Sequence, residues 1–266
     1  MLQDIIIWFL NLSPKTKRFF WRFWYDLFAK KSKNQNLTFM NYGFAEEGML
    51  SDFSGNQHEV LSAQLYHHIA TQVDINNKKV LEVGSGRGGG AFYIHSSLNT
   101  HSVTGLDISK EGTSLAKNLY NVPGLSFVQG DSESLPFQNK TFDIVINIES
   151  SHCYGNINQF VGEVYRVLTK KGVFLWCDFR TKVDMQKLFY VFKSSGFSII
   201  KEKNITKNIV NSLALLTPYR SMQIKKYIPK PLQRVFKSYS GVSGSDMYNA
   251  FLSERIIYKS AALKKL

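Results

Sequence analysis

A chain of 266 residues, 44% of them hydrophobic, can bury one domain with a sizeable insertion or two small domains. Its two cysteines, Cys153 and Cys177, lie in or beside apolar runs, which favours reduced thiols over a disulfide scaffold. The apolar run at residues 5–10 is too short to span a bilayer and lacks the flanks of a secretion signal. We therefore expect a cytoplasmic protein.

Basic ends flank a mildly acidic centre. Residues 1–35 hold 7 Lys/Arg against 2 Asp/Glu, residues 36–179 hold 9 against 14, and residues 180–266 hold 17 against 4, within a formal net charge of +13. This asymmetry suggests that the ends meet an anionic or interfacial partner. A basic surface that only keeps the protein in solution is the alternative, and the charge by itself does not separate the two.

The N-terminal segment combines aromatic and basic side chains. Ser13 followed by Pro14 predicts the start of a helix. The helix would carry seven aromatic residues among its cations: Phe19, Phe20, Trp21, Phe23, Trp24, Tyr25 and Phe28. Such a helix is typical of peripheral contact with a membrane surface. It would serve equally as a lid over a hydrophobic pocket, and the two hypotheses are compatible.

From residue 58 onward the chain alternates helices and strands. A helix is predicted at 58–73, followed by strands at 79–83, 102–107, 125–129, 142–148, 173–178, 197–201 and 256–261. Between them, helices are predicted at 89–98, 110–121, 157–169 and 185–195. This alternation is typical of βαβ units and predicts a doubly wound α/β sheet.

A basic stretch of about fifty residues separates the last two strands, which is too long for a simple hairpin. Pro218, Pro229 and Pro231 are expected to break helices within it. We therefore predict four regions: an N-terminal helix and lid at 1–57, a core at 58–206, a helical substrate cap at 207–254, and a last core strand at 255–266.

A glycine-rich turn follows the first strand at Gly84, Gly86, Gly88 and Gly89. Glycines let a backbone approach a nucleotide-type ligand closely, but this spacing also occurs in NAD-binding domains. The acidic residues at the ends of the first three strands are a more specific signal than the glycines. Glu82 is positioned for an ammonium group, Asp107 for ribose hydroxyls and Asp131 for an adenine amine.

This pattern predicts S-adenosylmethionine as the cofactor. A turn-forming aspartate is the alternative for Asp107 and Asp131. The other residues expected in the cofactor site are Ser85, Ile108, Ser132 and Asn147.

The fourth strand ends at a polar run that includes Glu149, His152 and Tyr154. In open α/β sheets these strand ends face the ligand. His152 is the predicted general base, because imidazole titrates near neutral pH. Asp178, at the end of the fifth strand, is predicted either to orient His152 or to contact the substrate. A structural histidine and a helix-capping aspartate are the alternatives. No spacing of His, Cys or carboxylates suggests a metal site.

These motifs make the chain resemble class I methyltransferases, and more narrowly the phthiotriolone/phenolphthiotriolone dimycocerosates methyltransferase family. The resemblance runs over roughly residues 15–262. It rests on Gly88-Gly89-Gly90, Leu135-Pro136-Phe137, Glu149-x-Ser151-His152-Cys153-Tyr154 and Gly241-Val242-x-Gly244-Ser245, while the basic region 207–240 and the loop residues Ser85 and Arg87 depart from it.

The resemblance implies a Rossmann-like seven-stranded methyltransferase sheet and O-methylation of a hydroxyl on a hydrophobic small molecule or polyketide-type lipid. The substrate residues that we expect are Tyr42, Tyr66, His67, Glu149 and Tyr154. A C-methyltransferase of quinone or sterol type is the nearest alternative. An RNA or protein methyltransferase and an inactive cofactor-binding scaffold are further ones. We expect no nucleic-acid partner, because no nucleic-acid-binding module is recognisable.

Overall fold

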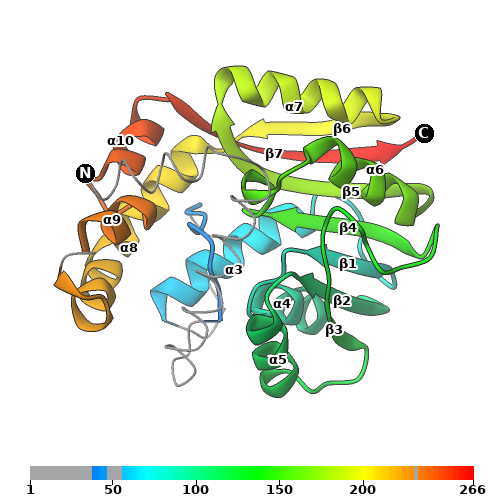
Figure 1. Cartoon of the computed structure of the whole chain (residues 1–266), viewed down its shortest axis with the longest axis horizontal. Helices are drawn as coiled ribbons and strands as arrows, with labels where there is room; N and C mark the ends of the chain where they lie inside the picture. Colours follow the sequence, from blue (N-terminus) through cyan, green and yellow to red (C-terminus); the bar gives the residue numbers. More distant parts are fainter. Residues whose placement is uncertain (1–37, 47–55, 231–232) are drawn as a thin grey trace.

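A seven-stranded mixed sheet organises the molecule (Figure 1). The computed structural model describes residues 38–46, 56–230 and 233–266. The strand order is β3-β2-β1-β4-β5-β7-β6. The first five strands in sequence pair in parallel, and β7 runs antiparallel to both β5 and β6. The order reverses beside β1, which is the place where doubly wound sheets bind ligands.

The strands are β1 (Lys79–Val83), β2 (Ser102–Asp107), β3 (Leu125–Gln129), β4 (Phe142–Ile148), β5 (Leu168–Thr181), β6 (Phe197–Asn204) and β7 (Ile256–Lys265). The helices are α3 (Gln57–Ala70), α4 (Gly89–Ser97), α5 (Lys110–Leu119), α6 (Ile157–Val167), α7 (Lys182–Ser194), α8 (Thr206–Tyr227), α9 (Gln233–Tyr239) and α10 (Asp246–Leu252). A short 3₁₀ turn, η1 (Ser151–Cys153), follows β4.

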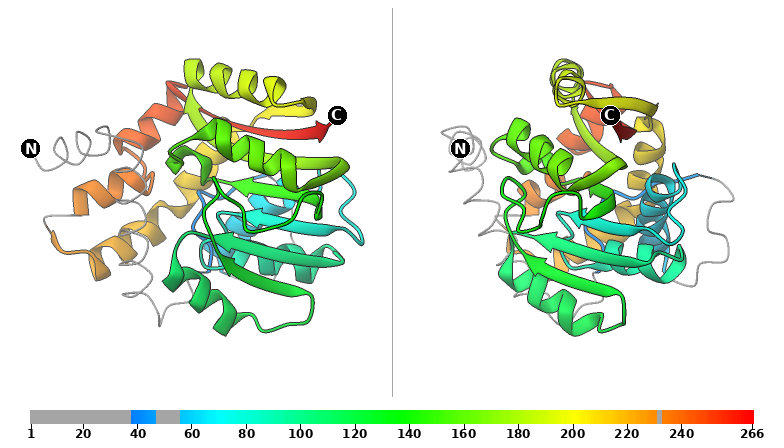
Figure 2. Two further views of the ribbon diagram at one scale, coloured as in Figure 1. Left: turned by 45° about the vertical axis from the view of Figure 1, so that its right-hand side comes forward. Right: turned by 90° about the vertical axis from the view of Figure 1, so that its right-hand side faces the viewer.

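The sheet is buried on both faces because side chains alternate along each strand. In β1, Val80 belongs to the core under α3 and α4, whereas Leu81 belongs to the core under α6 and α7. Figure 2 shows the sheet edge-on between these two layers of helices. The predicted α/β fold is confirmed.

Local signals account for where several helices begin. Asn56 caps α3 in a capping box with Glu59, and Ser109 caps α5 by accepting from the Gly112 amide. The start of α4 has no side-chain cap, because Gly88 stands there in a left-handed conformation with φ +83°. The amides at this end of α4 follow directly on the glycine turn, where an anionic or electron-rich ligand is favoured.

Two sequence expectations were wrong in detail. Strand β5 is longer than predicted, because its polar end pairs with β7 as far as Thr181↔Ile256. Helix α8 passes through Pro218 instead of breaking there. Pro218 is exposed, and next to it the Thr217 hydroxyl donates to the Leu213 carbonyl at 2.8 Å. The solvent-facing side of the helix therefore tolerates the missing amide donor.

Helices α8, α9 and α10 lie together at one end of the sheet (Figure 1). The predicted aromatic helix lies outside the described residues. Among the described helices, none combines the length and the apolarity that a transmembrane span requires.

Candidate active site

A pocket opens where β1, β2, β3 and β4 end, at the reversal of strand order. Its walls are the glycine turn after β1, the acidic strand ends, the end of β4 and the segment 38–41. The lining residues are Thr38, Phe39, Met40, Asn41, Tyr66, Gly84, Ser85, Gly86, Arg87, Gly90, Leu106, Asp107, Ile108, Ser109, Gly112, Gly130, Asp131, Ser132, Ile148, Glu149, Ser150, Cys153 and Tyr154. Most of the predicted cofactor residues are therefore gathered in one place.

The glycine turn leaves room for a ligand at Gly86. A Cβ built there would meet no atom closer than the Met40 sulfur at 3.6 Å, so it would occupy pocket space. Gly86 also has φ +53°, a conformation that side-chain-bearing residues rarely adopt. Gly88 lies behind the turn instead, where a Cβ would meet the Phe127 ring at 2.7 Å. Gly88 is therefore a packing residue of the loop.

Asp107 both lines the pocket and fixes the turn. Its Oδ2 accepts a hydrogen bond from the Gly86 amide at 2.8 Å, and its Oδ1 accepts one from the Ser109 amide at 2.8 Å. Asp131 lines the pocket at the end of β3, and its Oδ1 accepts from the Glu133 amide at 2.9 Å. Two carboxylates are thus held in fixed positions along one wall.

Glu82 lies behind this wall and is 1% exposed. Burial raises the pKa of Glu82 to about 7, partly offset by hydrogen bonds from the Tyr66 hydroxyl and the Ala91 amide. Tyr66 donates to Oε1 at 2.7 Å, while Oε2 has no hydrogen-bond partner of good geometry among the described residues. Leaving a buried carboxylate oxygen without a hydrogen-bond donor costs free energy. A ligand ammonium group beside Tyr66 would supply that donor to Glu82 and so would bind favourably.

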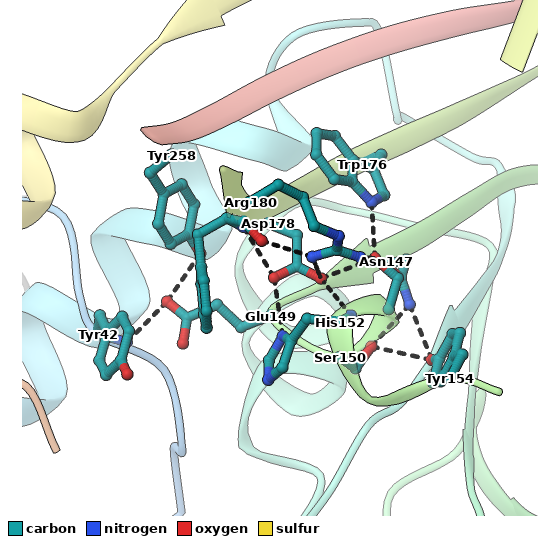
Figure 3. Close-up of polar contacts among 12 residues, drawn as sticks. Tyr42, Asn147, Glu149, Ser150, His152, Tyr154, Trp176, Asp178, Arg180 and Tyr258 are labelled. Atoms are coloured by element: carbon teal, nitrogen blue, oxygen red, sulfur yellow. Dashed lines mark hydrogen bonds and ion pairs between the residues drawn. The ribbon is translucent and has the colours of Figure 1, made fainter. Parts of the chain in front are cut away.

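Asn147 is also behind the wall and fully buried. Its amide donates to the Val83 carbonyl at 2.9 Å and to the Ser150 hydroxyl at 2.7 Å. The Tyr154 hydroxyl lies 3.0 Å from the same amide and 2.9 Å from Ser150. Asn147 therefore ties the end of β4 to the end of β1, and Ser150 and Tyr154 form the pocket surface above it (Figure 3).

Glu149 lines the pocket at the end of β4, with a positive φ of +46°. Such a conformation in a residue other than glycine costs energy, and it is common at functional sites. Its Oε1 accepts from the Tyr42 amide at 2.8 Å and from the Tyr258 hydroxyl at 2.7 Å. Burial raises the pKa of Glu149 to about 7, although these two donors oppose the rise. Figure 3 shows the carboxylate reaching between Tyr42 and Tyr258.

His152 and Asp178 form the predicted pair. His152 Nδ1 lies 2.9 Å from Asp178 Oδ1, and the His152 amide donates to Oδ2 at 2.9 Å. Arg180 makes a second ion pair with Asp178 at 3.2 Å. Burial lowers the pKa of His152, but its interactions with Cys153 and with the Asp178 carboxylate outweigh burial and raise the pKa to about 10. Burial opposes ionisation of Asp178, and the cations His152 and Arg180 outweigh it, so its pKa is held well below its usual range.

The remaining predicted residues are more dispersed. Tyr42 contacts the site through its amide, while its hydroxyl donates to the Tyr239 carbonyl at 2.7 Å. His67 is outside the pocket lining, and its Nδ1 lies 2.8 Å from the Tyr93 hydroxyl. Neither His152 nor Asp178 is among the lining residues. Within the described ranges, no group of three or more His, Cys or carboxylate side chains could hold a metal ion.

Sequence reasoning missed Tyr258 and Arg220, and it did not single out residues 38–41 within the predicted lid region 1–57. Arg220 is a single arginine in a basic region, yet it donates to the Ser240 carbonyl and, at 3.0 Å, to the Asn41 carbonyl. Tyr258 is an ordinary strand residue by its sequence. Only long-range pairing brings them to the pocket, so no local signal could have identified them.

Comparison with known proteins agrees with this geometry. A family model described as a methyltransferase domain matches residues 81–176. A cyclopropane synthase from Mycobacterium tuberculosis has a TM-score of 0.72 at 15% identity, covering 91% of this chain and 95% of that one. A likeness at that identity concerns the fold.

Similarity in sequence is more specific. The phthiotriol/phenolphthiotriol dimycocerosates methyltransferase of Mycobacterium tuberculosis is 31% identical, over 95% of this chain and 94% of that relative. The chain belongs to this methyltransferase family. A fatty-acid O-methyltransferase of Mycolicibacterium smegmatis is 34% identical, over 79% of this chain and 77% of that relative. The resemblance seen in the sequence is thereby confirmed.

As a member of the family, the chain is an S-adenosylmethionine-dependent methyltransferase. The pocket fits that cofactor, because Gly86 leaves space, Asp107 and Asp131 line one wall, and Glu82 Oε2, beside Tyr66, has no well-aligned donor in the described part of the chain. Which residue contacts which cofactor atom stays a prediction, as it was from the sequence.

Proposed function

We propose that this methyltransferase transfers the methyl group to a hydroxyl oxygen of a hydrophobic, lipid-like acceptor. The observation that carries this proposal is Glu149, a carboxylate on a pocket wall that also bears Phe39, Met40 and Ile148. Apolar walls with a small number of fixed polar groups are typical of sites for apolar ligands. The names of the two bacterial relatives, a dimycocerosates methyltransferase and a fatty-acid O-methyltransferase, support the same substrate class.

When bound, S-adenosylmethionine supplies a methyl carbon on a positively charged sulfur leaving group. As the new carbon–oxygen bond forms and the carbon–sulfur bond breaks, the acceptor hydroxyl must lose its proton. The protein therefore has to align the oxygen, exclude water and accept that proton. A carboxylate acceptor, as in a fatty acid, would need no such base.

We propose Glu149 as the group that accepts the proton. Its Oε1 is fixed by Tyr42 and Tyr258, and no donor from the described residues is bonded to its Oε2. A pKa near 7 suits a base that works at neutral pH. The pKa of His152, raised to about 10, keeps that imidazole protonated at the same pH.

In this proposal His152 and Asp178 act differently from the sequence-based hypothesis of a histidine base. Asp178 holds Ser151 by a 2.7 Å hydrogen bond and His152 through both its amide and its ring. The pair thereby fixes η1, which begins two residues after Glu149. His152 and Asp178 are then positioning residues for the carboxylate.

The test uses the full chain with S-adenosylmethionine carrying a carbon-13 methyl group. Three acceptors are compared: a long-chain secondary alcohol, its methyl ether, and the corresponding fatty acid. The proposal expects an O-methyl product from the alcohol and none from the ether. Labelling of a carbon atom would establish the C-methyltransferase alternative instead. Methylation of the fatty acid alone would retain the lipid substrate but remove the need for Glu149 as a base.

A further inference from the structure

The exposed positions of α8, apart from Tyr227 at its last residue, form one continuous face. They recur every third or fourth residue, and at 3.6 residues per turn they fall on one side of the helix. The outward face of α8 consists of Lys207, Asn211, Ala214, Leu215, Pro218, Met222, Lys225 and Lys226. Its centre is apolar, its two ends are basic, and it contains no acidic residue.

Two apolar side chains are strongly exposed at the centre of this face. Leu215 is 48% exposed and Met222 is 56% exposed, and each lies about one turn from Pro218, on either side of it. Contact of leucine and methionine side chains with water is unfavourable, and covering them with a partner is stabilising. The face therefore has the composition of a docking surface.

The charge around the face is predominantly positive. Thr206–Leu252 holds seven Lys/Arg residues and one acid, Asp246. Beyond the face itself, Lys230, Arg234 and Lys237 are also exposed. Such a surface is complementary to an anionic partner.

The opposite side of α8 holds the segment that walls the pocket. Ser212 donates to the Tyr42 carbonyl at 2.9 Å, and Asn208 donates to the Ala45 carbonyl at 3.0 Å. Arg220 donates to the Asn41 carbonyl at 3.0 Å. One helix thus connects the pocket wall to the outward face.

We propose that the outward face of α8 docks on an anionic lipid surface. Leu215 and Met222 enter the headgroup region, and Lys207, Lys225 and Lys226 contact lipid phosphates. A second copy of the chain is a poor occupant, since a two-fold interface would oppose these cations with their own copies. Residues 1–37 are equally unsuited by charge, with seven Lys/Arg against two Asp/Glu.

Docking in this way would hold the pocket segment one helix away from the bilayer in which a lipid acceptor partitions. That consequence rests on the proposed function, whereas the docking itself does not. If no lipid is methylated but the chain still binds vesicles, the proposed substrate class is wrong and the proposed docking surface stands.

The experiment measures co-sedimentation of the full chain with phosphatidylcholine vesicles, with and without phosphatidylglycerol. The first variant is Leu215→Ser with Met222→Ser, and the second is Lys225→Gln with Lys226→Gln. The matched control is Val183→Ser with Tyr190→Ser, because these side chains are 59% and 73% exposed and belong to a different helix, α7. Thermal unfolding and S-adenosylmethionine binding by calorimetry verify that each variant is folded.

The proposal expects the parent chain to bind vesicles with phosphatidylglycerol and to lose binding as salt rises. Each α8 variant should bind vesicles at least about tenfold more weakly than the parent. One lysine near an anionic surface raises the affinity about fivefold, and the second variant loses two. The control should match the parent. Absence of parental binding, or equal binding by the α8 variants, would overturn the proposal. The proposal would also be overturned if the parent chain formed a dimer and bound no vesicles, and Leu215→Ser with Met222→Ser converted that dimer to monomer.

Discussion

At the scale of single residues, one buried carboxylate, Glu82, and one half-buried carboxylate, Glu149, have different partners. Glu82 is joined to Tyr66 behind the cofactor wall, and Glu149 is joined to Tyr42 and Tyr258 on the pocket surface. Both have a pKa raised to about 7, chiefly by burial. Because their pKa values are alike, we assign the two roles by position. Glu149 lines the pocket and is the proposed base, whereas Glu82 lies behind the cofactor wall.

Glu149→Gln keeps an oxygen for Tyr42 and Tyr258 but removes the base. We expect the rate of methyl transfer to a hydroxylated lipid to fall about 10²–10⁴-fold, the usual contribution of general base catalysis. The parental rate should rise with pH through an apparent pKa near 7, and the variant should lose this dependence. Single-turnover rates across pH measure both. If His152→Gln rather than Glu149→Gln removes the pH dependence, the histidine is the base.

Asp107→Ala should weaken S-adenosylmethionine binding strongly. The substitution removes a charged acceptor from the pocket wall and also frees the Gly86 and Ser109 amides. Hydrogen bonds to charged groups contribute about 1.5–3 kcal/mol, so we expect at least a tenfold loss of affinity by calorimetry. Asp184→Ala, on the surface of α7, is the matched control. Unchanged affinity in Asp107→Ala would contradict the assigned position of the cofactor.

At the scale of elements, the glycine turn and the acids after β1, β2 and β3 could be located from the sequence, because they follow apolar strands in register. The length of β5 could not, since its polar end is a strand only through pairing with β7. The continuation of α8 through Pro218 was also missed, because solvent exposure decides whether a lost amide matters. Arg220 reaches the pocket segment across 179 residues of sequence, a separation that no local pattern reports.

The contact between α8 and the pocket segment should contribute measurably to stability. Arg220→Met removes the donors to the Asn41 and Ser240 carbonyls while keeping an unbranched apolar side chain. We expect the free energy of unfolding in urea to fall by about 2 kcal/mol. Arg234→Met, at an exposed position, should change it by less than about 0.5 kcal/mol. Equal effects of the two variants would mean that Arg220 does not hold the segment.

At the scale of the whole molecule, buried ionisable groups make stability depend on pH in opposite directions. A carboxyl whose pKa is raised on folding binds its proton more tightly in the native state, so its contribution to stability falls as pH rises from about 4.5 to 7. Glu149 is such a group. Burial chiefly lowers the pKa of His58 and His68 to about 4, so these histidines destabilise the fold as pH falls.

Because these contributions overlap, the clean prediction is a difference between two proteins. Relative to the parent, Glu149→Gln should gain stability as pH rises from 5 to 8, on the order of 3 kcal/mol in total. Chemical denaturation at several pH values measures this difference. A constant difference across that range would show that Glu149 titrates normally in the folded protein.

Methylation of a lipid by this family member is tested by transfer of a radiolabelled methyl group from S-adenosylmethionine into a total lipid extract, with RNA and protein fractions incubated in parallel. We expect label in the lipid fraction, lost in Asp107→Ala and strongly reduced in Glu149→Gln. Label in RNA or protein alone would contradict this expectation.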